Sequence, residues 1–304
     1  MKGDIIALGA HFGAGIIAII FFEAVIYQSC WVKIIYKVCT CCFKTSQKGQ
    51  GKKIFDELQN MDDDVQREEE RVLSMSAKDL QVRVAQFRKV FKTGLMTNTV
   101  AVHKASFGLE TGECFALLGV NGAGKTTTFK SLTNEEVPTD GEVSVGGYSI
   151  LSQFGKARHM IGYCPQANQL FEVLTVRENL EFFARVKGVA GKIRSKLIDR
   201  TIEVMNLGEH ANKEAGNLSG GNKRKLQVAI AIIGSPAIVL LDEPSAGMDP
   251  EARRFMWSVV AGLSEKKKKC AVILTTHSME EAEALSSKMG IMVKGGVFKC
   301  FGSV

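Results

Sequence analysis

A glycine-rich segment, Gly119-Val-Asn-Gly-Ala-Gly-Lys-Thr-Thr127, carries the residue types that bind phosphate groups. It lies between an apolar run that predicts a strand, Cys114 to Leu118, and a segment that predicts a helix as far as Leu132. Glycines let the backbone wrap closely around a phosphate, and the helix N-terminus adds partial positive charge. In such a loop the lysine reaches the β- and γ-phosphates, and the hydroxyl after it is placed to ligate Mg²⁺. The spacing predicts a nucleotide site built from Gly119, Val120, Asn121, Gly122, Ala123, Gly124, Lys125, Thr126 and Thr127.

An apolar run that ends in two acids, Ile238-Val-Leu-Leu-Asp242-Glu243, predicts a buried strand that presents carboxylates at its C-terminal end. Asp242 suits Mg²⁺, directly or through water. Glu243 would polarise a water molecule that attacks the terminal phosphate. An acid that follows a strand is often only solvated, but the position of Glu243 beside a metal-binding acid favours the catalytic role.

A third motif, Leu218-Ser-Gly-Gly-Asn-Lys-Arg-Lys225, precedes an apolar segment from Leu226 to Ile233 that predicts a helix. Ser219 can cap the N-terminus of that helix, and the two glycines after it clear the backbone for a phosphate. Ser-Gly-Gly alone is a common loop. Its place shortly before the acidic strand gives it significance, because one superfamily of nucleotide-binding proteins uses these motifs in this arrangement.

With these three motifs in this order, the chain resembles the ATP-binding cassette of ABC transporters. The resemblance implies four further functional residues. Gln166 matches the glutamine of the Q-loop, which contacts Mg²⁺ and couples to the membrane domain, and Asp249 matches the D-loop. His277 matches the switch histidine that contacts the γ-phosphate, and Phe91 stands where the family stacks an aromatic ring on adenine.

The resemblance implies a cassette that binds ATP and Mg²⁺ and hydrolyses ATP. The catalytic residues it implies are Glu243, His277 and Lys125. The Mg²⁺ ligands it implies are Thr126, Gln166 and Asp242. In the family two cassettes pair head to tail, so that each ATP is held by the P-loop of one and sealed by the third motif of the other, here Ser219, Gly220, Gly221 and Asn222. The expected partner is a second cassette, either another copy of this chain or the other half of a full transporter.

Longer phrases narrow the resemblance to the A subfamily, whose full members export lipids. The resemblance extends from Asp62 to the C-terminus, and Asn222, where most cassettes carry Gln, is itself a trait of that subfamily. Two positions depart from the common pattern. Asn134 stands where Gly is usual, in a loop expected to tolerate it, and Phe91 stands where Tyr is commoner. The resemblance implies that ATP-driven pairing of cassettes powers lipid transport.

The predicted fold class is α/β: a P-loop NTPase cassette of the ABC type, with a parallel sheet at its core and a helical subdomain that bears the Ser219 motif. Strands that alternate with helices favour a parallel sheet with its ligand at the C-terminal ends of the strands. Residues from Ala271 to Thr275 predict another core strand, and residues from Leu180 to Met205 predict mainly helix. Three helix starts are predicted, by capping boxes at Thr175–Glu178 and Ser278–Glu281 and by the pair Asp249-Pro250.

The N-terminus carries a segment long enough to cross a membrane. No residue from Ile5 to Phe22 is charged, and about 24 residues of helix span about 36 Å, more than a hydrocarbon core of about 30 Å. A signal peptide or a buried helix is disfavoured by this length and by Asp4 near the start. Lysines without any acid follow from Cys30 to Lys53, so this side of the span is expected to face the cytosol.

Three parts are therefore predicted: a transmembrane helix over 1–29, a juxtamembrane linker over 30–75 that is first basic and then acidic, and a nucleotide-binding domain over 76–304. The phrase that ends at Val304 usually leads into further cassette sequence, so the domain is expected to be truncated. Cys39, Cys41 and Cys42 lie just past the predicted span, where S-palmitoylation and free thiols are both consistent with the sequence. The expected protein is integral to a membrane, contacts its lipids and holds its cassette in the cytosol.

Composition and motifs weigh against other classes of protein. Of 304 residues, 45% are hydrophobic and 23% charged, as in globular proteins, and the net charge of +7 is too small by itself to indicate nucleic acid as a partner. A P-loop kinase would lack Leu218-Ser-Gly-Gly. A non-transport ABC ATPase of translation or DNA repair would lack the N-terminal span. An ATP-binding regulatory module tethered to a membrane would be expected to have lost Glu243 or His277.

Overall fold

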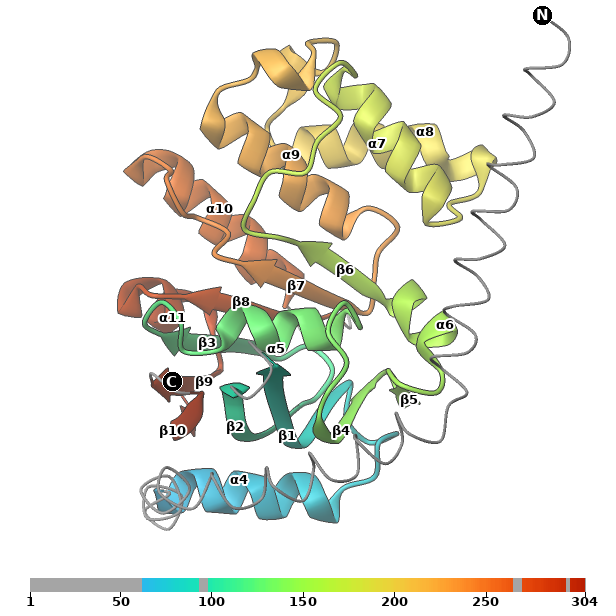
Figure 1. Cartoon of the computed structure of the whole chain (residues 1–304). Helices are drawn as coiled ribbons and strands as arrows, with labels where there is room; N and C mark the ends of the chain where they lie inside the picture. Colours follow the sequence, from blue (N-terminus) through green and yellow to red (C-terminus); the bar gives the residue numbers. More distant parts are fainter. Residues whose placement is uncertain (1–61, 93–97, 265–269, 294–295, 304) are drawn as a thin grey trace, which may run out of the picture. The chain divides into compact units, whose positions relative to one another are not determined.

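A mixed sheet runs through the part of the chain that the structure, a computed structural model, describes: residues 62–92, 98–264, 270–293 and 296–303 (Figure 1). These residues belong to one compact unit, Met61–Val304. Its strands are β1 Val82–Lys92, β2 Asn98–Leu109, β3 Cys114–Gly119, β4 Asp140–Val145, β5 Tyr148–Ser149, β6 Ile161–Cys164, β7 Ile238–Asp242, β8 Ala271–Thr276, β9 Lys288–Val293 and β10 Val297–Ser303. They lie side by side in the order β5–β4–β1–β2–β10–β9–β3–β8–β7–β6.

One half of the sheet contains the parallel core. The strands β3, β8, β7 and β6 run parallel to one another, with Ala116 paired to Leu274 and Leu240 paired to Ile273. Every residue of β7 and β8 is buried, as expected for parallel strands that helices cover on both faces. The parallel core that the sequence predicts is confirmed. The C-terminal ends of these strands, which carry Gly119 and Asp242, lie at the same end of the sheet.

The other half is largely antiparallel, which differs from the parallel sheet that the sequence predicts. β1 pairs antiparallel with both β2 and β4, and β5 extends β4. Only residues 93–97 separate β1 from β2, and a connection that short allows a hairpin but not the crossover that parallel neighbours require. The expectation of a parallel sheet is therefore right for the core and wrong for the pairs that join β1 to β2, β1 to β4, β4 to β5 and β9 to β10.

Helices cover both faces of the parallel core. On β3, Phe115 and Leu117 pack with α5 (Lys125–Leu132), whereas Ala116 and Leu118 belong to the cluster formed with α9 (Gly220–Ile232), α10 (Pro250–Leu263) and α11 (Met279–Leu285). Successive side chains of a strand point to opposite faces. The helix that follows the P-loop and the helix that follows Ser219 therefore lie on opposite faces of the sheet.

The stretch predicted to be mainly helical forms two helices, α7 (Val176–Val186) and α8 (Gly191–Val204), which lie beside α9 in Figure 1. Between them, Lys187 donates hydrogen bonds to the carbonyls of Ile230 and Ala231 at 2.9 and 2.7 Å, and so caps the C-terminal end of α9. The remaining short helices are α6 Phe154–Ala157, η1 Arg158–Met160, η2 Gly208–His210 and η3 Ala215–Asn217.

Of the predicted helix starts, the capping box at Thr175 is present in full. Asp249 caps α10 by accepting from the backbone N–H groups of Glu251 and Ala252, with Pro250 in the first turn. Of the two hydrogen bonds in the capping box predicted at Ser278, only one is present. The Ser278 hydroxyl accepts from the Glu281 N–H at 3.4 Å, but the Glu281 carboxylate does not return to the cap. It accepts instead from Thr276 and Trp257, for the reason given below.

Asn134, the departure after the P-loop helix, has a φ of 57°, in the left-handed region. Glycine adopts this conformation without strain, and asparagine is among the few other residues that tolerate it. The conformation explains both why glycine is usual at this position and why asparagine is accepted.

A helix precedes the first strand and belongs to the same compact unit. This helix, α4 (Asp63–Ser74), buries Val65 and Val72, and its Asp64 carboxylate accepts from the Phe301 N–H of β10 at 2.8 Å. Glu68 accepts from the Gly108 N–H of β2 at 2.9 Å. The boundary predicted at residue 76 therefore falls after an element whose apolar face packs on the sheet; the acidic character of α4 concealed that face in the sequence.

Replacement of Val72 by alanine should lower the free energy of unfolding by about 1–3 kcal/mol, because it removes two methylene-sized groups from a fully buried position and leaves a cavity. The matched control is Leu73→Ala, one residue further on α4 with 47% of its surface exposed, which should change stability by less than about 0.5 kcal/mol. Chemical denaturation of the full chain measures both. Equal, small effects would mean that α4 does not contribute to the folded cassette.

None of the helices within the described residues has the length and apolar character needed to cross a membrane. The predicted transmembrane helix over 1–29 and the three clustered cysteines lie outside the described residues, as does the linker up to residue 61.

Candidate functional site

The P-loop connects the end of β3 to the start of α5. Gly122 and Gly124 have φ values of 79° and 101°, which a residue with a side chain rarely adopts. At Gly124 a Cβ atom would also lie 2.6 Å from the Ala101 carbonyl oxygen of β2. The Lys125 ammonium is buried and donates hydrogen bonds to the carbonyls of Gly119 at 2.5 Å and Val120 at 3.3 Å. The loop therefore carries its cation inside the turn, at the N-terminal end of a helix, where an anion is stabilised.

An oxygen-rich centre lies beside this loop, at the C-terminal ends of β7 and β8. Asp242 is only 2% exposed, and its Oδ1 atom accepts from the Thr275 hydroxyl at 2.5 Å. The Thr126 side chain, in the first turn of α5, also hydrogen-bonds to this carboxylate. Burial raises the pKa of Asp242, and these two hydrogen bonds oppose the rise. The structure thus brings together two residues, Thr126 and Asp242, that the sequence assigned to a metal.

Glu243 follows Asp242 and has an unusual backbone. Its φ is 51°, in the left-handed region, which costs about 1–2 kcal/mol for a residue with a Cβ atom. Its N–H donates to both the hydroxyl and the carbonyl of Thr275, at 3.0 and 3.2 Å. The strained conformation turns the chain immediately after β7, and the hydrogen bonds to Thr275 hold the turn on the neighbouring strand.

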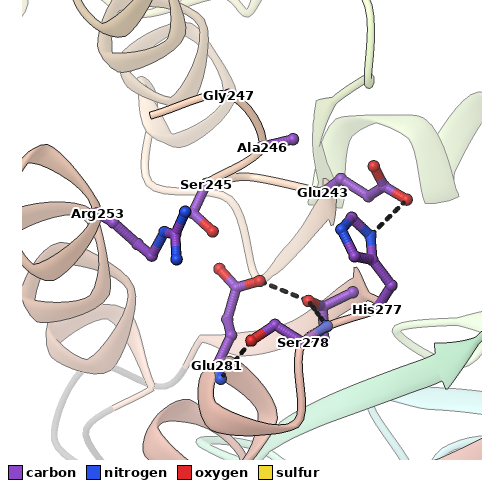
Figure 2. A pocket seen from close by; sticks show the side chains of 9 residues that line it. Glu243, Ser245, Ala246, Gly247, Arg253, His277, Ser278 and Glu281 are labelled. Carbon is purple, nitrogen blue, oxygen red and sulfur yellow. Dashed lines mark hydrogen bonds and ion pairs between the residues drawn. The ribbon is translucent and has the colours of Figure 1, made fainter. Parts of the chain in front are cut away.

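Two side chains hold the Glu243 carboxylate. Gln166 Nε2 donates to its Oε2 at 3.0 Å, and His277 Nδ1 lies 3.4 Å from its Oε1. Gln166 follows β6 and His277 follows β8, so three parallel strands deliver these groups to one point. Figure 2 shows the His277 ring turned toward Glu243. The Glu243 side chain is almost buried, whereas His277 is 64% exposed and open to a ligand or a second molecule.

A cavity of about 150 Å³ adjoins this carboxylate (Figure 2). Its walls come from the turn after β7, from Arg253 of α10 and from the start of α11. Glu281, in this wall, is 2% exposed; it accepts from the Thr276 hydroxyl at 2.6 Å and from Trp257 Nε1 at 3.1 Å. A buried carboxylate needs such donors, which is why Glu281 does not complete the predicted capping box.

Thr275 and Glu281 belong to this centre, although the sequence predicts neither as a functional residue. Its patterns predict an apolar strand that includes Thr275 and a helix cap that includes Glu281. The available signal for Thr275 was a pair of threonines at the C-terminal end of a strand next to the acidic one. For Glu281 the local sequence indicates only a capping box, because one of its two partners, Trp257, comes from a different helix and the other, Thr276, stands directly after a predicted strand.

Phe91 lies near the end of β1, paired with Thr99 of β2, and the Lys89 ammonium lies 4.8 Å from the centroid of its ring. Ala101, two residues beyond Thr99, is the residue whose carbonyl approaches Gly124 of the P-loop. Phe91 is therefore held on β1, beside the strand β2 that the P-loop contacts. It is half-buried, so that part of the ring remains accessible.

The Ser219 motif does not join the centre within one chain. Ser219 caps α9, and Gly220, Gly221 and Asn222 form the first turn of that helix, on the face of the sheet opposite α5. Asp249 caps α10, on the same face as α9. Among the described residues, no hydrogen bond or ion pair links Ser219 or Asn222 to the P-loop.

Comparison with known proteins agrees with this geometry. Residues 102–246 match the family described as ABC transporter. The chain is 45% identical over 243 residues to human ATP-binding cassette sub-family A member 2. The aligned region covers 80% of this chain and 10% of that protein. The chain is also 46% identical over 256 residues to mouse phospholipid-transporting ATPase ABCA3. This aligned region covers 81% of this chain and 15% of that protein. The chain thus spans only a small part of the length of these relatives.

Solved structures share the fold. The ATP-binding cassette MJ0796, described as a dimer in a post-hydrolysis state bound to ADP and Pi, aligns with a TM-score of 0.67 at 24% identity, over 73% of this chain and 98% of that one. CbiO1 from Clostridium perfringens, part of an ABC transporter complex, aligns with a TM-score of 0.66 at 25% identity, over 74% and 89% of the two chains. From the family match, the identity to the relatives and the fold, this chain carries an ATPase cassette of the ABC transporter family, and its sequence is of the A-subfamily type.

Proposed function

We propose that this cassette binds MgATP and hydrolyses it in a pair with a second cassette, and that the pair powers the movement of lipid by a membrane transporter. The observation that carries the proposal is the placement of the Glu243 carboxylate. It lies between Gln166 and His277, directly after Asp242, at the end of the sheet where the P-loop begins α5. A general base must be within reach of the water it activates, and this carboxylate stands next to the loop that would hold the terminal phosphate.

Residues at the start of α5 and at the ends of β6 and β7 fit a hard divalent cation. The Thr126 hydroxyl, the Asp242 carboxylate and the Gln166 amide oxygen are all oxygen donors, the type that Mg²⁺ prefers. Among the described residues, no group of three or more His, Cys, Asp or Glu side chains could hold a metal ion by itself. This matches Mg²⁺, which is commonly bound by one or two carboxylates and by the phosphates of the nucleotide. Bound there, it would neutralise charge on the phosphates.

The chain's own residues divide the work of hydrolysis. The N–H groups from Gly119 to Thr127 and the Lys125 ammonium would bind the phosphates, with Lys125 exchanging its loop carbonyls for phosphate oxygens. Phe91 would stack on adenine. The Glu243 carboxylate would orient the attacking water and take its proton, while His277 contacts the γ-phosphate. In this proposal Gln166 senses the nucleotide and holds Glu243 in place.

The second cassette follows from the position of the Ser219 motif. Its N–H groups, at the start of α9, suit a phosphate, but α9 and α5 lie on opposite faces of the same sheet. Ser219, Gly220, Gly221 and Asn222 would therefore complete the site of another cassette. The solved cassette described with ADP and Pi is a dimer, which supports this arrangement. The names of the relatives, which include phospholipid-transporting ATPases, support lipid as the cargo. The predicted span over 1–29 supports a membrane location.

Paired hydrolysis predicts that ATPase activity of the full chain rises more steeply than linearly with its concentration. Ser219→Arg should abolish most of this activity, because it places bulk and charge where the second cassette must seat. Ser74→Arg, at an exposed position in the last turn of α4, is the matched control and should leave the rate unchanged. The rate of phosphate release, measured as a function of protein concentration, tests whether hydrolysis requires a pair of cassettes. Undiminished, strictly linear activity in Ser219→Arg would show that one cassette suffices.

A further inference from the structure

Arg224, on α9, is buried and hydrogen-bonds only to backbone carbonyls among the described residues. Its side chain is 4% exposed. Nε donates to Pro244 O at 3.2 Å, Nη1 to Pro165 O at 2.6 Å and to Gln166 O at 3.1 Å, and Nη2 to Asp242 O and to Glu243 O, the latter at 2.9 Å. A guanidinium has five N–H groups, so each of them has one acceptor.

This arrangement joins two separate segments of backbone. One is the loop after β6, which carries Gln166, and the other is the turn after β7, which carries Glu243. The side chains of these two residues meet at 3.0 Å, and the same guanidinium holds the main chain of both. The Glu243 backbone is in the left-handed region and needs support from its surroundings to stay there. The two hydrogen bonds from Nη2 supply part of that support.

A lysine could not replace this group. Its ammonium has three N–H groups on a flexible stem, whereas the arginine fork is planar and reaches both segments at once. A buried cation is also costly unless its donors are all satisfied. An arginine that served only to stabilise α9 would not require acceptors from the two segments that place the candidate base and its amide partner.

We propose that Arg224 is a positioning residue for ATP hydrolysis: it fixes the main chain at Gln166 and at Glu243 so that the Glu243 carboxylate is held where water is activated. The inference rests on the proposed function. Because Ser219 begins the same helix, Arg224 also connects the surface that would meet the second cassette to the catalytic turn. A displacement of about 1 Å at a reacting group can cost about a hundredfold in rate, so a small change at this helix is sufficient to alter hydrolysis.

Gln227, one turn further along α9, provides a matched control. It too is buried and bonds to the loop after β6: it donates to Ala167 O at 3.1 Å and accepts from the Gln169 N–H at 3.2 Å. Among the described contacts it makes no hydrogen bond to residues 242–244. Variants at Gln227 therefore disturb the same helix and the same loop but leave the turn at Glu243 untouched.

The test compares Arg224→Lys, Arg224→Gln and Gln227→Ala in the full chain by steady-state ATPase kinetics and by thermal unfolding. In the Arg224 variants we expect kcat to fall tenfold or more, with KM and the affinity for MgATP within about twofold, and Lys to retain more activity than Gln. In Gln227→Ala we expect kcat within about threefold of the wild type. A folded Arg224→Gln variant with normal kcat, or equal losses at both positions, would overturn the proposal.

Two further measurements separate a positioning role from a loss of folding. If Arg224 acts through Glu243, then Arg224→Lys added to Glu243→Gln should slow hydrolysis no further; an additive loss would contradict the role. Amide hydrogen exchange should increase in both 165–169 and 242–246 in Arg224→Lys, but only in 165–169 in Gln227→Ala. If the wild type hydrolyses no ATP, the proposed function fails, and exchange still decides whether Arg224 holds the two segments: unchanged exchange in 242–246 would exclude it.

Discussion

Glu243→Gln is expected to lower kcat for ATP hydrolysis by about a hundredfold to ten-thousandfold, the usual contribution of a general base, while the affinity for MgATP remains close to that of the wild type. The amide keeps the size of the side chain and can still accept from Gln166, but it cannot take a proton from water. Because ATP then stays bound, the two cassettes should remain paired. The variant should sediment as a dimer in MgATP and as a monomer without nucleotide.

The control for this change is Glu280→Gln, in the exposed first turn of α11 and close to His277 in sequence, which should leave both kcat and the oligomeric state unchanged. Normal hydrolysis by Glu243→Gln would remove this carboxylate from the catalytic role. A Glu243→Gln chain that binds ATP and stays monomeric would mean that the cassette pairs only within a larger assembly.

Lys125→Ala should weaken MgATP binding by roughly tenfold to a hundredfold or more. Hydrogen bonds to a charged group contribute about 1.5–3 kcal/mol, and the variant leaves the phosphate charge without its cation. Within the part of the chain that the structure describes, Lys125 bonds only to carbonyls of its own loop, so its removal should cost little stability compared with its cost in affinity. Calorimetric titration of the full chain with MgATP measures the change.

The matched control is Lys130→Ala, on the exposed side of the same helix α5, which removes an equal charge outside the loop and should leave the affinity within about twofold. If Lys125→Ala and wild type bind MgATP equally well, the assignment of this loop to the phosphates is wrong. Equal losses in both variants would indicate a general effect of charge rather than a contact with phosphate.

The sequence by itself determined the parts of this cassette whose chemistry is contiguous. Three features are of this kind: the P-loop, the acidic end of β7 and the cap at Ser219. Each consists of residues that are close together in the sequence, because glycine geometry, strand burial and N-capping are local properties of the chain. The buried strands β7 and β8 were predictable for the same reason: each is an uninterrupted apolar run. The resemblance to a known family then supplied roles for Gln166 and His277, which no local signal assigns.

Tertiary structure alone decided how these parts meet. Gln166, Glu243 and His277 come together only because β6, β7 and β8 are parallel neighbours whose ends coincide. The sequence predicts α4 as part of a linker, because five acids, two arginines and a glutamine surround the two valines that anchor this helix. The sequence predicts Glu281 as part of a cap, because its actual partners, Thr276 and Trp257, are set by the packing of α10 and α11 against β8.

Arg224 shows the physical reason most directly. In the sequence it is one of three basic residues after Ser-Gly-Gly-Asn, and no local pattern predicts a different environment for it than for Lys223 and Lys225. Its neighbours Lys223 and Lys225 are part-exposed, and only Arg224 turns into the protein. Its acceptors are backbone carbonyls, and every residue has one. No pattern of side chains in the sequence can therefore predict which carbonyls accept these hydrogen bonds. Such a contact exists only once the strands have placed those carbonyls around the helix.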